Sequence, residues 1–365
     1  SQLPMRFRFL LLHRMALLAG LWSLLWWGSG CGPHSAGNNP EADKRVRTSR
    51  PERHPPIRGI SFVAPRIPIS IEDMRPVTQT HANWIAIVPY GFTYAGSPRL
   101  IFDTTRQWWG ETPYGAAAQI SMARQLDLKI MLKPQVWVIG QGWAGDFDLQ
   151  RESQWQEWER NYRRFIMTYA RIADSLNVEL FCLGTEYRIA ARKRPDFWRG
   201  LSDSIRNFYE GQLTYAANWD NFKAIQFWDA LDYAGIDAYF ALTARQSPSP
   251  ALLDSAWQPH LRQLEAFHQS TGKPILFTEY GYPSAAGALH KPWKSAGRGV
   301  SVNLDLQQKG LEALYQNFWP QAWFAGGFLW KWHATYRARG GPHDAGYTPQ
   351  NKPVLETVEQ WYNPR

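Results

Sequence analysis

The sequence predicts a (β/α)8 TIM barrel, an α/β fold in which eight parallel strands alternate with helices. Apolar runs of strand length recur beyond residue 57, without the polar alternation of strands that face water on one side. Longer segments with apolar residues three and four positions apart separate most of these runs. Strands buried on both faces and separated by helices are typical of a closed parallel sheet, and 365 residues suffice for one such barrel with additional segments.

The elements of this barrel follow in order along the chain. Strands are expected at residues 59–63, 84–88, 128–132, 178–183, 213–216, 233–236, 275–277 and 327–330. Helices are expected at residues 114–126, 154–176, 195–209, 256–270 and 306–317, and residues 221–231 leave room for only a short helix. The second of these helices carries Trp155, Trp158, Tyr162 and Phe165 at spacings of three and four, which predicts an aromatic face packed on the barrel.

Residues 1–31 are expected to be a signal peptide. Arg6 and Arg8 precede an apolar stretch, and small residues lead to Cys31. Small residues before a cysteine at such a point resemble the bacterial lipobox, in which the thiol is acylated. Lipidation of Cys31 would anchor the protein to a membrane. Gly28 departs from the aliphatic residue usual at that position, and an ordinary signal peptide or an uncleaved anchor is the alternative.

Residues 32–56 are expected to form a disordered tether. They are rich in Pro, Asn, Ser, Arg and Glu and hold almost no large apolar side chain. The folded domain is then expected at residues 57–365, exported to the bacterial cell envelope. The formal charge of the chain is +9, of which the first 56 residues carry a net +5, so about +4 remains on the domain. This balance argues against nucleic acid as a partner.

Two glutamates directly follow apolar runs. Glu186 comes after the fourth predicted strand and Glu279 at the end of the seventh, where barrels place their chemistry. Hydrolysis of a glycosidic bond requires a proton donor and a second carboxylate, and carboxyl groups about 5–5.5 Å apart act with retention. Lys133 or Arg188 is placed to hold one carboxylate ionised, and burial favours the protonated form of the other. Either glutamate by itself is explained as well by a rim ion pair.

The aromatic content points to carbohydrate. The chain contains 20 Trp, 16 Tyr and 18 Phe, which is more than a barrel core usually requires, although the core accounts for over half of them. Indole and phenol rings stack on the C–H faces of sugars. A metal is not expected, because His333, His343 and Asp344 lack the helical spacing of a zinc hydrolase, and no cofactor motif follows a strand.

These segments resemble glycoside hydrolase family 113, which belongs to the retaining barrel glycosidases of clan A and whose known members are mainly β-1,4-mannanases. The resemblance runs from about residue 58 to the end of the chain. It is carried by residues 184–186 (GTE), 232–239 (DYAGIDAY), 274–281 (PILFTEYG) and 327–332 (GFLWKW), together with 347–353 (YTPQNKP).

The resemblance implies roles for individual residues. Glu186 would be the acid/base and Glu279 the nucleophile, with Tyr239 supporting the nucleophile and Trp330 forming the floor under the reacting sugar. Further substrate-binding candidates follow from position alone; they are Lys133, Trp137, Asn218 and Trp219. Most clan members carry Asn before the acid/base, where it contacts the sugar 2-hydroxyl, and this chain has Thr185 instead.

The function expected from these observations is hydrolysis of a β-linked oligo- or polysaccharide, with endo-β-1,4-mannanase activity favoured. One alternative keeps the reaction and changes the sugar to a glucan or xylan. A second alternative is a glycan-binding surface lipoprotein on a barrel scaffold without catalysis. The presence of both carboxylates favours the enzyme, because a binding module does not need them.

Overall fold

The computed structural model describes residues 56–297 and 299–364. The predicted signal peptide, Cys31 and residues 32–55 of the predicted tether lie outside the described residues. No helix in the described part of the chain is both long and apolar enough to cross a membrane.

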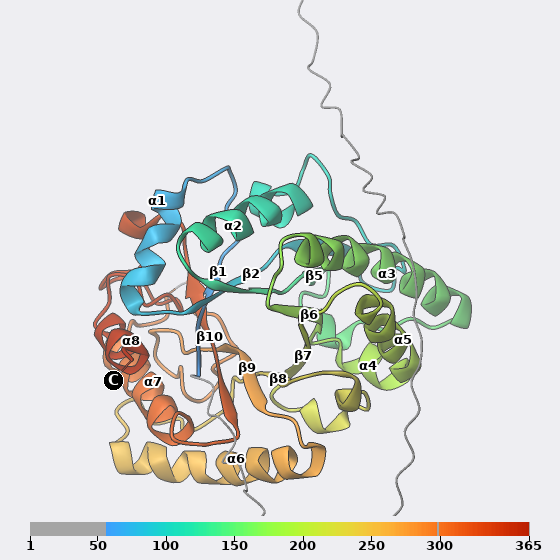
Figure 1. The fold of residues 1–365 in the computed structure, drawn as a ribbon. Coiled ribbons are helices and arrows are strands. Elements are labelled where there is room, and N and C mark those ends of the chain that lie inside the picture. Colours follow the sequence, from blue (N-terminus) through green and yellow to red (C-terminus); the bar gives the residue numbers. More distant parts are fainter. Residues whose placement is uncertain (1–55, 298, 365) are drawn as a thin grey trace, which may run out of the picture. The chain divides into compact units, whose positions relative to one another are not determined.

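Eight parallel strands close into a barrel, as predicted (Figure 1). In chain order they are β1 (Ile57–Phe62), β2 (Trp84–Ile87), β4 (Lys129–Leu132), β6 (Leu180–Thr185), β7 (Gln212–Asn218), β8 (Ala234–Asp237), β9 (Ile275–Tyr280) and β10 (Phe324–Trp332). Each strand pairs with its neighbours in chain order, and β10 pairs with β1 to close the barrel. The fourth and seventh strands of the prediction are therefore β6 and β9.

The helices surround the strands (Figure 1). They are α1 (Ile71–Met74), α2 (Pro113–Gln125), α3 (Glu152–Ser175), α4 (Arg188–Lys193), α5 (Pro195–Arg206), α6 (Pro250–Thr271), α7 (Leu304–Phe318) and α8 (Val354–Tyr362). All five long helices of the prediction are present. The segment at 221–231 holds two short 3-10 turns, η4 (Phe222–Ala224) and η5 (Trp228–Ala230). The sequence prediction lacked α1, α4 and α8.

A second, two-stranded parallel sheet was not predicted. Its strands are β3 (Tyr90–Tyr94) and β5 (Gln135–Ile139), which follow β2 and β4 after Pro89 and Pro134. Proline has no backbone N–H and interrupts a ladder, so each barrel strand ends and a separate strand begins beyond it. This small sheet carries Tyr90, Gln135 and Trp137 to the barrel mouth.

The apolar core has two layers. Inside the barrel lie small and large side chains that fill the lumen, among them Trp84, Cys182 and Phe328. Gly59 leaves space for the Phe328 ring, because a Cβ on Gly59 would lie 2.3 Å from it. The second layer lies between strands and helices, and the predicted aromatic face of α3 belongs to it. A filled lumen leaves the barrel mouth as the place for a cavity.

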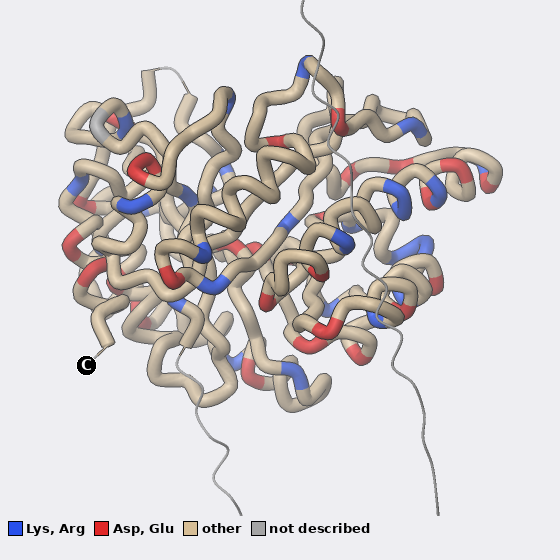
Figure 2. Tube along the Cα trace, turned by 45° about the horizontal axis from the view of Figure 1, so that its top comes forward, with Lys and Arg blue, Asp and Glu red and all other residues tan. Residues whose placement is uncertain are grey.

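Positions of basic and acidic residues alternate along the helices (Figure 2). Some of them join neighbouring helices. Arg194, between α4 and α5, contacts Glu152 at 2.9 Å and Glu159 at 2.6 Å, and both glutamates belong to α3. These ion pairs join α3 to the segment between α4 and α5.

Candidate active site

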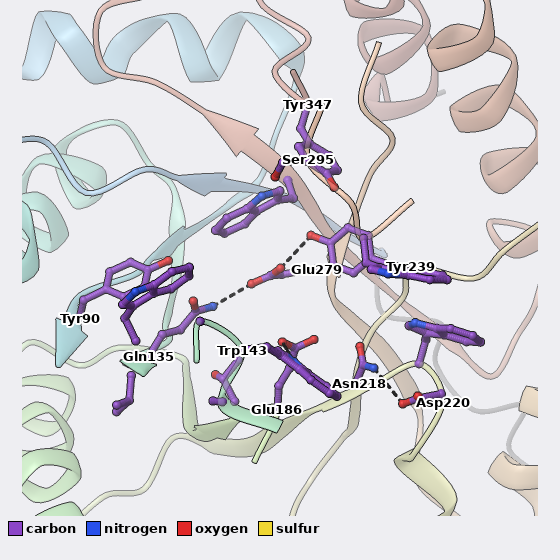
Figure 3. Close-up of a pocket in the computed structure, with 18 residues that line it drawn as sticks. Tyr90, Gln135, Trp143, Glu186, Asn218, Asp220, Tyr239, Glu279, Ser295 and Tyr347 are labelled. Carbon is purple, nitrogen blue, oxygen red and sulfur yellow. Dashed lines mark hydrogen bonds between the residues drawn. The ribbon is translucent and has the colours of Figure 1, made fainter. Parts of the chain in front are cut away.

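A cavity of about 530 Å³ opens at the carboxyl ends of the barrel strands, a size typical of ligand sites. Its lining brings together residues at the carboxyl ends of β6, β7, β8, β9 and β10, from the small sheet of β3 and β5, and from the loops beyond them (Figure 3). The residues that line it include Tyr90, Gln135, Trp137, Trp143, Thr185, Glu186, Asn218, Trp219, Tyr239, Glu279, Trp293, Trp330 and Tyr347. Both predicted catalytic glutamates are therefore in one cavity.

Glu279, at the end of β9, accepts hydrogen bonds from three side chains. Lys133 Nζ lies 2.5 Å from its Oε1, and Gln135 Nε2 lies 2.8 Å from the same oxygen. The Tyr239 hydroxyl donates to Oε2 at 2.8 Å (Figure 3). Glu279 itself is buried. These donors fix the orientation of the carboxylate and complement a negative charge on it.

Beneath Glu279 lies a buried charged group. Lys133 Nζ also contacts Asp237, at 3.1 Å, and Asp237 accepts a further bond from the Thr278 hydroxyl at 2.8 Å. Burial by itself lowers the pKa of Lys133, but Asp237 and Glu279 outweigh it and raise that pKa above its ordinary value. Burial and the neighbouring Glu279 raise the pKa of Asp237 to about 7. Lys133 thus remains charged between two carboxyl groups.

Glu186, at the end of β6, has different surroundings. Its Oε2 accepts a hydrogen bond from the indole Nε1 of Trp143 at 2.7 Å. Its backbone has φ of 55°, in the left-handed region that residues other than glycine rarely adopt. The surrounding backbone holds this conformation, since Glu186 N donates to Ala216 O at 2.7 Å. Strained backbone of this kind concentrates at functional positions.

Burial raises the pKa of the Glu186 carboxyl well above its ordinary value, and the nearby carboxyl groups of Asp237 and Glu279 raise it further. Lys133 and the Trp143 hydrogen bond act in the opposite direction but do not reverse the effect. Two glutamates in one cavity thus differ in charge environment, which is the arrangement that separates a proton donor from a charged carboxylate.

Tryptophan side chains surround the two carboxyl groups. Trp137 and Trp330 line the cavity on the side of β5 and β10, and Trp219 stacks on Trp293 with ring centroids 5.2 Å apart. Trp143 lies against the Arg188 guanidinium, 5.0 Å from its ring centroid, and Arg188 pairs with Asp146. Flat aromatic walls around a polar centre suit a chain of sugar rings.

Two polar side chains lie beside Glu186. Asn218 Nδ2 donates to Asp220 at 2.8 Å (Figure 3). The hydroxyl of Thr185 is buried and has no hydrogen-bond partner among the described residues. A buried hydroxyl without a partner costs free energy, so a ligand hydroxyl in the cavity would relieve that cost.

The structure brings together seven of the eight predicted catalytic and substrate-binding residues in the cavity lining. The exception is Lys133, which is fully buried and does not belong to the lining found in the described structure. It contacts Glu279 from below, in agreement with its other predicted role of holding a carboxylate ionised.

Trp143, Trp293 and Gln135 were not among the predicted site residues. Trp143 lies on the loop after β5 and Trp293 on the loop after β9, far in sequence from both glutamates. Gly145 makes room for the Trp143 ring, since a Cβ there would lie 2.3 Å from it. Gln135 follows the third barrel strand by three residues, a position that marks it as a rim residue without specifying its contact with Glu279.

A TIM barrel whose mouth holds two carboxyl groups in unlike surroundings, enclosed by aromatic walls, defines the class of the protein as a glycoside hydrolase. The sequence model of Glycoside Hydrolase Family 113 matches residues 66–352. The chain belongs to this family, which confirms the resemblance seen in its motifs.

Solved structures share the fold. The GH113 β-mannanase AaManA from Alicyclobacillus acidocaldarius, in complex with ManMIm, is 24% identical, with a TM-score of 0.74 over 84% of this chain and 97% of that one. A GH113 β-1,4-mannanase is 23% identical, with a TM-score of 0.75 over 86% of this chain and 100% of that one. The Ruminococcus gnavus β-glucuronidase is more distant, with 12% identity, a TM-score of 0.58, and coverage of 84% and 50%. No curated protein matches the chain.

Proposed function

We propose that this protein is an endo-acting β-1,4-mannanase that cleaves with retention, with Glu279 as nucleophile and Glu186 as acid/base. The observation that carries the proposal is the difference between the two carboxyl groups. Glu279 contacts a buried ammonium group at 2.5 Å, whereas burial raises the pKa of Glu186. A charged carboxylate and a protonated one in the same cavity are what retention requires.

In the first step Glu279 attacks the anomeric carbon and forms a covalent glycosyl ester. Glu186 gives its proton to the departing glycosidic oxygen, so that the leaving chain is released as an alcohol. Tyr239 and Gln135 orient the attacking carboxylate through their hydrogen bonds. Lys133 acts on the reaction through Glu279 and is a positioning residue.

In the second step Glu186 accepts a proton from water, and the water oxygen attacks the same carbon. Glu279 leaves as a carboxylate, and the two inversions give net retention. The charge of Glu279 helps to raise the pKa of Glu186. Formation of the ester removes that charge, so the pKa of Glu186 falls at the stage when Glu186 must act as a base.

Mannan is proposed as the substrate because of family membership and because solved family 113 structures are described as β-mannanases. Aromatic side chains from several strand ends support action within a chain. Trp219 and Trp293 line the cavity from the loops after β7 and β9, and Trp137 and Trp330 line it from β5 and β10. Such a cleft can hold several consecutive sugars.

The test is digestion of β-1,4-mannan, xylan and β-1,4-glucan, with the anomeric form of fresh products followed by NMR. We expect mannan to be cleaved fastest, to short oligosaccharides whose new reducing ends first appear as the β-anomer. Glu279→Gln should lower kcat by about 10⁴-fold or more, as expected for loss of a nucleophile. First appearance of the α-anomer would contradict retention, and faster cleavage of xylan or glucan would contradict the choice of mannan.

The proposed location is the bacterial cell envelope, with the protein anchored through lipid on Cys31. The basic and apolar pattern of residues 5–31 supports this proposal. We expect a radiolabelled fatty acid to be incorporated into the native protein and not into Cys31→Ser. The matched control is Cys182→Ser, which alters the second of the two cysteines and should retain the label. Equal labelling of native protein and Cys31→Ser would exclude the anchor.

A further inference from the structure

A second cavity adjoins the first. It has a volume of about 630 Å³ and lies among the loops that follow β1, β2 and β10. Three side chains line both cavities, namely Tyr90, Trp137 and Trp330. The second cavity therefore begins where the lining around the glutamates ends, and it is positioned to receive the same glycan chain.

This cavity is lined by basic side chains. Arg66, Lys331 and Arg339 contribute to its lining. No carboxylate in residues 56–297 and 299–364 forms an ion pair with any of these three. The Arg66 guanidinium lies over the Trp108 ring at 5.3 Å, and Lys331 Nζ lies over Trp330 at 5.1 Å.

The carboxyl groups near the cavity are already engaged. Glu111, in the lining, accepts the backbone N–H of Trp108 at 3.0 Å, and burial raises its pKa. Asp344, which influences Lys331 electrostatically, pairs with Lys352 at 2.8 Å. Desolvation lowers the pKa of Lys331, while Glu279 and Asp344 act to raise it without forming an ion pair with it. Arg66 and Arg339 therefore provide positive charge that no ion pair among the described residues neutralises.

The cavity lies on one defined side of the proposed cleavage point. Neither Glu186 nor Glu279 lines the second cavity, whereas Trp330 lines both cavities. The family resemblance places Trp330 under the reacting sugar, which is the sugar on the non-reducing side of the cleaved bond. The second cavity continues from Trp330 and is therefore assigned to the non-reducing part of the glycan.

We propose that this second cavity binds a sugar unit that carries an anionic substituent, on the non-reducing side of the cleaved bond. This inference rests on the proposed function and extends its substrate class to β-1,4-mannan chains that also carry acidic units. Exposed Trp108 and Trp137 provide ring faces for the sugar. Arg66 and Arg339 provide guanidinium groups, which bind carboxylate or sulfate through paired N–H donors.

Binding of defined oligosaccharides tests the inference without hydrolysis. The protein carries Glu186→Gln, whose amide replaces a carboxyl group expected to be protonated. Three probes are compared by calorimetry: β-1,4-mannohexaose, the same chain with C6 of its non-reducing units oxidised to carboxylate, and the same chain O-sulfated at those units. We expect an anionic probe to bind about tenfold more tightly than the neutral chain, with the preference decreasing as salt is raised.

Variants that remove charge identify the groups that cause the preference for an anionic probe. The double variant Arg66→Gln with Arg339→Gln, both at exposed positions, should reduce the ratio of anionic to neutral probe affinity to about one. The double variant Arg66→Lys with Arg339→Lys should retain part of the preference. The matched control is Arg262→Gln on α6, an exposed residue outside both cavities, which should leave the preference unchanged.

The outcomes are separable. Preference for the carboxylate probe indicates a uronic acid and preference for the sulfate probe indicates a sulfate ester, and each supports the inference. Equal or weaker binding of both anionic probes, or a preference that survives removal of both arginines, overturns it. Hydrolysis of neutral mannan by the native enzyme is measured separately, so its absence refutes the proposed function and not the charge preference.

Discussion

The ends of β6 and β9 each carry a glutamate, but the hydrogen-bond donors and charges around the two side chains differ. Glu279 on β9 accepts hydrogen bonds from an ammonium, an amide and a hydroxyl, whose residues lie just beyond the ends of β4 and β8 or in the small sheet. Glu186 on β6 accepts one bond, from an indole on a loop, and sits on left-handed backbone. The chemistry of a carboxyl group is therefore set by its donors and neighbouring charges and not by residue type.

The largest expected effect comes from removing the cation beneath Glu279. Lys133→Met leaves Asp237 and Glu279 as buried carboxyl groups without a counter-charge. We expect a loss of about 3–5 kcal/mol of unfolding free energy at neutral pH, together with a loss of most activity. Because protonation relieves the repulsion, the difference from the native protein should shrink as pH falls. Urea unfolding at several pH values measures it.

Lys352→Met is the matched control for that variant. Lys352 is likewise buried and pairs with an aspartate, Asp344, but it does not contact Glu279. It should destabilise the fold while retaining more activity. If both lysine variants lost activity equally, Lys133 would have no special link to the nucleophile.

A smaller effect is expected from Tyr239→Phe. The variant removes the hydroxyl that donates to Glu279 at 2.8 Å. A hydrogen bond to a charged group is worth about 1.5–3 kcal/mol, so kcat should fall about 10–100-fold with KM little changed. Tyr347→Phe is the control, because Tyr347 lines the cavity but donates to Pro292 O. Initial rates on mannan distinguish the two, and equal losses would argue against orientation of Glu279 by Tyr239.

The pH profile reports on the other glutamate. Glu186 must be protonated in the first step, so kcat/KM is full below its pKa and falls as pH rises through it. Trp143→Phe removes a hydrogen-bond donor that favours the charged form of Glu186, so the pKa of Glu186 should rise. The alkaline limb of the kcat/KM profile should therefore move to higher pH, by up to about 1 unit. Trp293→Phe, which lines the cavity without contacting Glu186, should leave the limb in place. A shift to lower pH would refute this view of Trp143.

The smallest effect concerns stability. The pKa of Glu186 in the folded state lies above its ordinary value. The proton on this carboxyl group therefore adds to the free energy of unfolding at low pH, and this stabilisation is lost as pH rises through the folded-state pKa. Glu186→Gln has no proton to lose, and it should exceed the native protein in unfolding free energy by about 1–2 kcal/mol at alkaline pH. Below pH 4 the two should agree. Lower stability of the variant at alkaline pH would count against the raised pKa.

The strands and long helices were predictable because burial on both faces leaves unbroken apolar runs and helices repeat every three to four residues. Helix α8 carries the same signal in Val354, Val358 and Tyr362, which are buried at spacings of four, although the prediction omitted it. The small sheet of β3 and β5 was harder to predict from the sequence, because each strand follows a proline and exposes part of its apolar surface.

The candidate site likewise contains residues that could be located from the sequence and residues that could not. Position after a strand locates Glu186, Glu279, Tyr239 and Trp330, since strand ends of a barrel converge. The same rule places Lys133 at the rim, yet its side chain turns beneath Glu279 and is fully buried. Trp143 reaches Glu186 from a long loop, and the spacing of residues within a loop carries no information about which strand end it approaches.

The assignment of the two glutamates is tested most directly by trapping with azide. An aryl β-mannoside with a good leaving group needs no acid for the first step, so Glu186→Ala should still form the ester, and azide should then be incorporated as the β-mannosyl azide. Glu279→Ala cannot form the ester, and azide entering the vacated space should give the α-mannosyl azide. Exchange of these two products between the variants would contradict the assignment of Glu279 as nucleophile and Glu186 as acid/base.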